Sequence, residues 1–215
     1  MKKYVVKIPF FVPFFFPKRR WHFSRTEKTI YLTFDDGPIP EVTPWALNEL
    51  KKHNAKATFF CIGKNIEENP GIFRQITQEG HTVGNHTYNH LNGWQTETSV
   101  YIENVEKSER QVTEDGEKVK NKELLFRPPY GKITGKQAKF LWKKGYQIVM
   151  WDVLSGDFDK TLSKEKCLEN VLKNSGNGSI VIFHDSEKAS KNLQYVLPKV
   201  LAHFSEKGFR FKAIA

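Results

Sequence analysis

The sequence predicts an α/β fold, namely a distorted (β/α)7 barrel, similar to a TIM barrel, in which parallel strands are surrounded by outer helices. Strand-like apolar segments alternate with helix-like amphipathic segments from residue 29 to the end of the sequence. The strand-like segments are almost continuously apolar, which indicates burial on both faces, as in parallel sheets. Polar residues follow several of these strands, at the end where such a barrel carries its functional site.

The expected strands are runs of β-branched and aromatic residues, most of which end at Gly, Pro, Asp or His. In chain order they are 29–34, 57–61, 82–85, 124–127, 146–151, 179–183 and 209–212. The expected helices carry apolar residues at helical spacing, as Trp45, Leu47 and Leu50 do in the first of them. In chain order they are 43–52, 66–79, 96–113, 134–144, 163–174 and 190–206. No linker or internal repeat interrupts the alternation.

The composition fits one globular domain, since 39% of the 215 residues are hydrophobic and 13% are aromatic, which excludes a disordered chain. Cys61 and Cys167 are too few for a disulfide scaffold and are expected to be buried thiols. The formal net charge is +10, but the Lys and Arg residues are scattered and no nucleic-acid-binding motif accompanies them. The charge therefore predicts no nucleic-acid partner and is compatible with an acidic glycan.

Residues 1–24 are expected to form an N-terminal arm, and residues 25–215 the main domain. The Phe-rich stretch 8–17 follows two lysines, as in a secretory signal, but Lys7 interrupts it, three prolines would break a helix, and no small-residue cleavage site follows. It is also shorter than the roughly 20 residues that span a membrane. We expect an extended arm packed on the domain, with a membrane contact as the alternative. The sequence leaves the compartment open between the cytoplasm and the cell envelope.

Two pairs of side chains point to a metal site. Asp35 and Asp36 follow a buried strand, where adjacent carboxylates repel each other unless a positive group holds them. His86 and His90 are four residues apart, a spacing that places both rings on one face of a helical turn. One carboxylate with two imidazoles leaves a coordination position open, which is typical of catalytic zinc. The second carboxylate is then free to accept a proton, so the pattern predicts a hydrolase.

Three motifs resemble those of a known family. They are Thr33–Pro38 (TFDDGP), His86–His90 (HTYNH) and Arg127–Gly131 (RPPYG). In this order they resemble the first three motifs of the polysaccharide deacetylases, which form carbohydrate esterase family four and contain the NodB homology domain. The resemblance extends over residues 29–212 and implies the same barrel fold.

The resemblance implies a role for each matching residue. Asp35 would be the general base, and Arg127 would keep it ionised through an ion pair. The backbone N–H of Tyr130 would help to stabilise the oxyanion, and Tyr130 would also border the substrate. The implied ligands of a divalent metal are Asp36, His86 and His90. The metal is expected to be zinc, with cobalt, nickel or manganese as alternatives.

The fifth motif of the family is similar to residues 180–185 (IVIFHD). There His184 would be the general acid that protonates the leaving amine. Ile182 would line the pocket for the acetyl methyl group.

The fourth motif departs from the family pattern. Leu154 occupies the position of an Asp, and Phe158 that of a Trp. Asp157 matches the remaining acid, and we expect it at the catalytic centre, either paired with Arg127 or tuning the general-acid histidine. Phe158 would wall the substrate pocket without the N–H of an indole.

These features predict a metal-dependent hydrolase that removes N-acetyl groups from N-acetylglucosamine-type residues of a glycan, such as peptidoglycan or a chitooligosaccharide. The expected partner is therefore an N-acetylated glycan. An O-acetyl ester hydrolase acting on xylan is the alternative within the same chemistry. A non-catalytic glycan-binding module is the alternative from another class, and the complete set of metal, base and acid positions argues against it.

Overall fold

The computed structural model describes residues 4–114 and 124–214. Its strands are β1 (Arg19–Arg20), β2 (Thr29–Asp35), β3 (Ala57–Cys61), β4 (Thr82–Asn85), β5 (Leu124–Phe126), β6 (Tyr146–Val149), β7 (Val153–Leu154), β8 (Ile180–His184) and β9 (Arg210–Phe211). Its α-helices are α1 (Val12–Phe15), α2 (Val42–Lys52), α3 (Gly63–Glu68), α4 (Pro70–Gln78), α5 (Thr98–Glu114), α6 (Gly135–Lys143), α7 (Lys164–Asn174) and α8 (Ser190–Glu206). Two 3-10 helices are η1 (Gly93–Gln95) and η2 (Pro129–Gly131).

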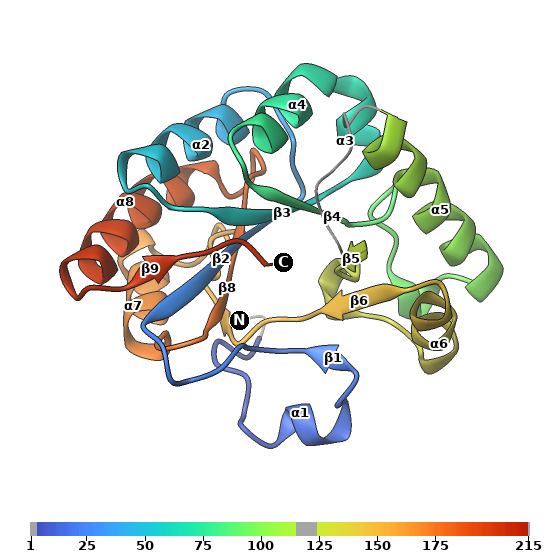
Figure 1. The fold of residues 1–215 in the computed structure, drawn as a ribbon, viewed down its shortest axis with the longest axis horizontal. Coiled ribbons are helices and arrows are strands. Elements are labelled where there is room, and N and C mark those ends of the chain that lie inside the picture. The colour runs from blue at the N-terminus through green and yellow to red at the C-terminus, as the bar shows by residue number, and fades with distance from the viewer. Residues whose placement is uncertain (1–3, 115–123, 215) are drawn as a thin grey trace.

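The strands form one curved sheet in the order β1-β6-β5-β4-β3-β2-β8-β7, and β9 also pairs with β2. Every pairing between the named strands is parallel. Helices α2 to α8 surround the curved sheet on its outside, as Figure 1 shows. The predicted distorted barrel of parallel strands with outer helices is confirmed.

Side chains alternate between the two faces of the sheet, as strand geometry requires. On β2, Ile30, Leu32 and Phe34 point outward into the large cluster that packs the sheet against the helices. A separate, smaller cluster fills the inside of the barrel, and its buried members are Phe60, Leu125, Val149, Ile180 and Ile214. Inward-facing positions near the ends of the strands are left for the polar residues described below.

Two expected elements differ from the prediction. The helix expected over 66–79 is divided into α3 and α4 at Asn69, because Pro70 has no N–H and restricts the backbone of the residue before it. The strand expected over 146–151 ends at Val149, and the short strand β7 follows it after a bend. Cys61 and Cys167 are buried free thiols, as predicted.

The N-terminal arm packs along the open edge of the sheet. Around Lys7 it pairs antiparallel to β7, with the Leu154 N–H donating to the Val6 carbonyl at 2.8 Å. Farther along, β1 pairs with β6, so the arm connects the two edge regions of the sheet. The arm is not extended throughout, because it contains the short helix α1. Pro13 is compatible with this helix because it lies in the first turn, where a proline needs no N–H. No helix in the described ranges has the length and apolar character needed to span a bilayer.

Candidate metal and catalytic centre

The polar residues singled out from the sequence gather at the C-terminal ends of the strands. Asp35 and His184 are the last residues of β2 and β8, and they are direct partners in the register of these neighbouring strands. His86 follows β4, Arg127 follows β5, and Asp157 lies in the loop after β7. In a parallel barrel these ends share one rim, which is where sites are built.

Asp36, His86 and His90 form a cluster whose ligand atoms all lie within 4.8 Å of one another. Oδ1 of Asp36 is 3.8 Å from Nε2 of His86 and 3.3 Å from Nε2 of His90. This oxygen is buried, yet it has no hydrogen-bond partner in the described part of the chain. A buried carboxylate oxygen facing two imidazole nitrogens is the donor set of a divalent metal site.

The environment of His86 suits a metal ligand. Its Nδ1 donates to the backbone carbonyl of Arg127 at 2.7 Å, which fixes the ring and leaves Nε2 free to coordinate. Complete burial, together with the neighbouring His90, lowers the pKa of His86 to about 3. Burial likewise lowers the pKa of His90. Both rings are therefore neutral at physiological pH, as metal binding requires.

Left-handed backbone conformations are concentrated around this cluster. Asp36 has φ 87°, Thr87 63°, His90 55° and Tyr130 59°, although none of these residues is glycine. The conformation is most unfavourable for the β-branched Thr87. Each such residue costs on the order of 1–3 kcal/mol, so the surrounding fold must hold the loops in place, a pattern typical of functional sites.

Asp35 is held by Arg127. Nη1 of the completely buried Arg127 lies 2.7 Å from Oδ1 of Asp35 and 2.7 Å from the Thr33 hydroxyl. Its other side-chain nitrogens donate to the carbonyls of Val149 and Met150 at 3.3 and 2.8 Å. Each of the three side-chain nitrogens of Arg127 therefore has an acceptor, and the ion pair fixes the position of the Asp35 carboxylate.

His184 is held by Asp157, which decides between the two partners expected for that carboxylate. One oxygen of Asp157 is 2.8 Å from Nδ1 of His184, and the other accepts its backbone N–H at 2.8 Å. Burial would lower the pKa of His184, but the charge of Asp157 and the hydrogen bond to it outweigh burial and raise that pKa to about 9. The imidazole is therefore protonated at neutral pH and can donate a proton.

The residues expected to contact substrate lie around these groups. Ile182 is buried two residues before His184 on the same face of β8. The Phe158 ring packs edge-on against His184, with their centroids 5.0 Å apart. Tyr130 is exposed and packs on His90 at 4.6 Å, and its N–H lies in the first turn of η2, where no intrahelical acceptor exists. Leu154, in place of the family's acid, is buried on β7.

The sequence analysis missed Asp185, which directly follows His184. Its completely buried carboxylate accepts the Gly37 N–H at 3.0 Å and the Thr43 hydroxyl at 2.6 Å, and so anchors the loop that carries Asp36. Burial raises the pKa of Asp185 to about 7. The available signal was an acid at the end of an apolar strand, the same signal that marked Asp35.

Tyr4 of the arm was also missed. Its ring packs against Phe158 with a centroid distance of 5.4 Å. Phe158 is thus enclosed between His184 and the arm. No sequence pattern links residues so far apart in the chain.

A family model described as polysaccharide deacetylase matches residues 23–149, more than half of the chain. The chain belongs to the polysaccharide deacetylase family. The family that the three motifs resembled is therefore confirmed, and the motifs contribute Asp35, Asp36, His86, His90 and Arg127 to the centre described above.

Named relatives cover three quarters of the chain or more. A peptidoglycan-N-acetylglucosamine deacetylase of Bacillus cereus is 37% identical over 91% of this chain and 90% of the relative. A chitooligosaccharide deacetylase of Azorhizobium caulinodans is 35% identical over 75% of this chain and 76% of the relative.

A solved structure is similar over almost its full length. The crystal structure of the Bc1960 peptidoglycan N-acetylglucosamine deacetylase, in complex with 4-naphthalen-1-yl-N-oxidanyl-benzamide, matches with a TM-score of 0.87 and 33% identity. The match covers 96% of this chain and 95% of that chain. The family is metal-dependent, and the buried, unbonded Oδ1 of Asp36 between two neutral histidines fits a divalent ion.

Proposed function

We propose that this protein is a metal-dependent hydrolase that removes the N-acetyl group from N-acetylglucosamine residues of peptidoglycan. The observation that carries the proposal is the arrangement of Asp35, held by Arg127, and His184, paired with Asp157, on neighbouring strands beside the cluster of Asp36, His86 and His90. The names of the relatives, which act on peptidoglycan or chitooligosaccharide, support the substrate class.

The ion proposed at this cluster is zinc, because one carboxylate and two imidazoles form a mixed oxygen and nitrogen donor set that leaves a position open. When bound, the metal supplies a Lewis acid that polarises the acetamide carbonyl and makes water more acidic. Cobalt, nickel and manganese accept similar ligands, and the metal content of the purified protein distinguishes them.

The proton transfers are assigned to two side chains. Asp35 accepts a proton from the attacking water while the water oxygen forms a bond to the acetamide carbon. The Tyr130 N–H donates to the carbonyl oxygen as negative charge develops on it. His184 gives its proton to the nitrogen as the carbon–nitrogen bond breaks, so that acetate and a free amino sugar leave. Asp157 keeps the His184 ring oriented and charged for this step.

Hydrolysis of an O-acetyl ester is the alternative reaction for the same site residues. Acetate release from N-acetylglucosamine oligosaccharides is compared with release from acetylxylan, and free amine is measured in parallel. We expect acetate and amine in equal amounts from the oligosaccharide and a lower kcat/KM for acetylxylan. Acetate from acetylxylan alone would replace the proposed amide substrate by an ester, and release from neither would contradict the proposed activity.

We also propose that the N-terminal arm contacts an anionic membrane surface and keeps the enzyme at the cell envelope. Phe10, Phe14 and Phe15 of the arm are 84%, 77% and 73% exposed, which is unusual for three large apolar side chains within six residues. Lys18 and Arg19 follow directly, so that apolar insertion and electrostatic attraction act at the same place. The net charge of +10 favours the same surface.

Flotation with phosphatidylglycerol-containing vesicles tests this contact. Wild-type protein is expected to float with anionic vesicles and to remain unbound with phosphatidylcholine alone. The Phe14→Ser/Phe15→Ser variant should lose the binding, whereas Phe140→Ser, which changes an exposed ring on α6, should retain it. Equal flotation of all three proteins would contradict the membrane role of the arm.

A further inference from the structure

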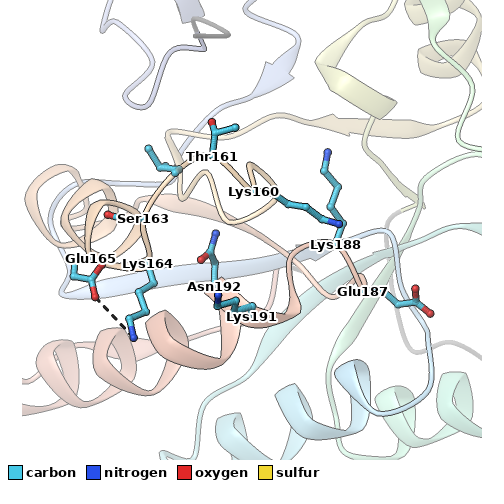
Figure 2. Close-up of a pocket in the computed structure, with 10 residues that line it drawn as sticks. Lys160, Thr161, Ser163, Lys164, Glu165, Glu187, Lys188, Lys191 and Asn192 are labelled. Carbon is cyan, nitrogen blue, oxygen red and sulfur yellow. Dashed lines mark ion pairs between the residues drawn. The ribbon is translucent and has the colours of Figure 1, made fainter.

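A cavity of about 720 Å³ lies beside the catalytic centre, and its size is within the range of about 300–1,000 Å³ typical of ligand sites. Figure 2 shows the loop after β7 on one side of the cavity, and the loop after β8 with the first turn of α8 on the other. Both loops leave the C-terminal ends of their strands, so the cavity opens on the same rim as the centre. None of the residues assigned above to metal binding or proton transfer lines it.

The charges around the cavity are predominantly positive. Its charged lining residues are Lys160, Lys164, Lys188, Lys191, Glu165 and Glu187. Lys164 is 3.9 Å from Glu165, the ion pair drawn in Figure 2. Lys160, Lys188 and Lys191 form no ion pair with any described residue. The lining therefore has two more ammonium groups than carboxylates, and three of the four lysines have no ion-pair partner among the described residues.

Direct contacts connect the cavity to the catalytic groups. Nζ of Lys188 lies 5.6 Å from the centroid of the Phe158 ring, which also packs against His184. Asn192, which also lines the cavity, donates to the backbone carbonyl of Asp157 at 3.1 Å. A single aromatic ring therefore separates the cationic cavity from the general acid.

The kind of positive group indicates the kind of ligand. The lining contains lysines and no arginine. Arginine recognises a carboxylate or phosphate through a fixed two-pronged geometry, whereas lysine acts as a mobile point charge. Mobile charges suit an anionic group that is attached to a flexible polymer. In peptidoglycan, the sugar next to each N-acetylglucosamine carries a lactyl carboxylate, which is either free or joined to a peptide that has carboxylates of its own.

We propose that Lys160, Lys188 and Lys191 form a subsite for a carboxylate on the sugar unit next to the one being deacetylated. This inference rests on the proposed function, because the occupant is the neighbouring unit of the same glycan. The subsite makes the protein prefer anionic glycan strands to neutral oligosaccharides of equal length. The preference comes from exposed charges, and added salt therefore reduces it.

Calorimetric binding and steady-state kinetics test the proposal with three ligands of equal sugar length. They are a neutral N-acetylglucosamine oligosaccharide, a peptide-free glycan strand with lactyl carboxylates, and the same strand with its peptides. The Lys188→Gln/Lys191→Gln variant removes two of the charges. The matched control, Lys139→Gln/Lys143→Gln, removes two exposed charges from α6, which lies apart from the cavity (Figure 1).

The wild type is expected to bind an anionic strand more tightly than the neutral oligosaccharide. Because contacts between exposed charges are individually weak, the double variant should lose about three- to tenfold of this preference, and the control variant should keep it. Loss with the peptide-free strand assigns the lactyl carboxylate, and loss only with the peptide-bearing strand assigns the peptide. An unchanged ratio of the dissociation constants in the double variant would overturn the subsite.

The two proposals fail in different ways. Turnover of the neutral oligosaccharide together with an unchanged binding ratio in the double variant would leave the deacetylase function standing and remove the subsite. Absence of turnover with all three ligands would contradict the proposed function. In that case the ratio of the dissociation constants, measured by calorimetry, would alone decide for or against the subsite.

Discussion

Several carboxylates surround His184, and Asp157 is the one that bonds to it within the described residues, through both the ring and the backbone amide. Burial opposes protonation of the ring, yet the negative charges around it raise its pKa from 6.5 to about 9. A pKa that is raised on folding stabilises the protein below pH 6.5, and this stabilisation is lost as the pH rises through about 9. One carboxylate therefore governs both the charge of the proposed acid and part of the pH dependence of stability.

Replacing Asp157 with Asn should lower the pKa of His184 below 6.5 in the metal-free protein, because burial then acts with much less opposition. NMR titration of the His184 ring measures this change. The loss of unfolding free energy between pH 6.5 and 9 should shrink in the same variant. Asp159→Asn removes a charge from the same loop without touching His184 and serves as the control. A His184 pKa near 9 in Asp157→Asn would contradict the assignment.

At the residue scale, the sequence predicted the members of the centre better than their partners. Asp35, Asp36, His86 and His90 could be found because adjacency and spacing are visible in one dimension. The partner of Asp157 could not be predicted, since the choice between Arg127 and His184 depends on how the loop after β7 folds back.

Among the elements, the loop between β2 and α2 carries Asp36 and is held from the neighbouring strand. The carboxylate of Asp185, the residue after β8, accepts hydrogen bonds from Gly37 in this loop and from Thr43 in the first turn of α2. Gly37 lies so close to Asp185 that an added Cβ would clash with the carboxylate. Glycine is therefore required here by close approach rather than by its backbone angles.

Gly37→Ala should displace this loop and weaken zinc binding about 10- to 100-fold, the effect typical of losing a group that orients a metal ligand. Competition with a chromophoric chelator measures the affinity. Gly71→Ala in α4 places its methyl group in open space and should leave zinc binding unchanged. Equal zinc affinity of the two variants would show that the contact with Asp185 does not position Asp36.

At this scale, periodicity predicted most elements, and local chemistry altered their ends. The interruption between α3 and α4 follows from Pro70, which was visible in the sequence but was placed within a continuous helix. The two-residue strands β1 and β7 carry no periodic signal, because alternation needs more residues to be recognised. Tertiary pairing alone defines them.

For the whole molecule, the arm and the barrel are joined by one buried carboxylate. The Asp152 carboxylate accepts hydrogen bonds from Lys7 at 2.8 Å, from Arg25 at 2.9 Å and from the Ser179 hydroxyl at 2.6 Å. Burial would raise the pKa of Asp152. The hydrogen bonds outweigh burial and lower the pKa, and the bond from Lys7 has the largest lowering effect. The clamp therefore stabilises the fold above the ordinary carboxyl pKa, and it weakens as the pH falls through the lowered value.

Asp152→Asn should decrease the unfolding free energy at pH 7 by about 1–3 kcal/mol, because charge-assisted hydrogen bonds to a buried oxygen become neutral ones. Both cationic partners are more than one-third exposed, which keeps the effect below that of a fully buried ion pair. Urea denaturation measures it. Glu27→Gln, which removes exposed ion pairs to Arg210 and Lys212, should have little effect. Equal stability of the two variants would exclude the clamp.

The barrel itself was predictable because each apolar strand and the following helix repeat one local pattern. The position of the arm was not, since its antiparallel contact with β7 joins segments more than 140 residues apart and leaves no trace in local composition. The cationic cavity was hidden for the same reason, because its lysines come from two segments that are far apart in the sequence, 160–165 and 187–192. Lysines that are scattered in the sequence therefore lie around one cavity in the fold.

In the proposed mechanism, metal binding and proton transfer are separate tasks of neighbouring residues. The most direct test measures acetate release from an N-acetylglucosamine oligosaccharide as metal-stripped protein is titrated with zinc, for the wild type and Asp35→Asn. Wild-type activity should rise with zinc and saturate at one ion per chain. Asp35→Asn should bind the same amount of zinc and release almost no acetate. Activity that is independent of zinc, or full activity of Asp35→Asn, would contradict the account.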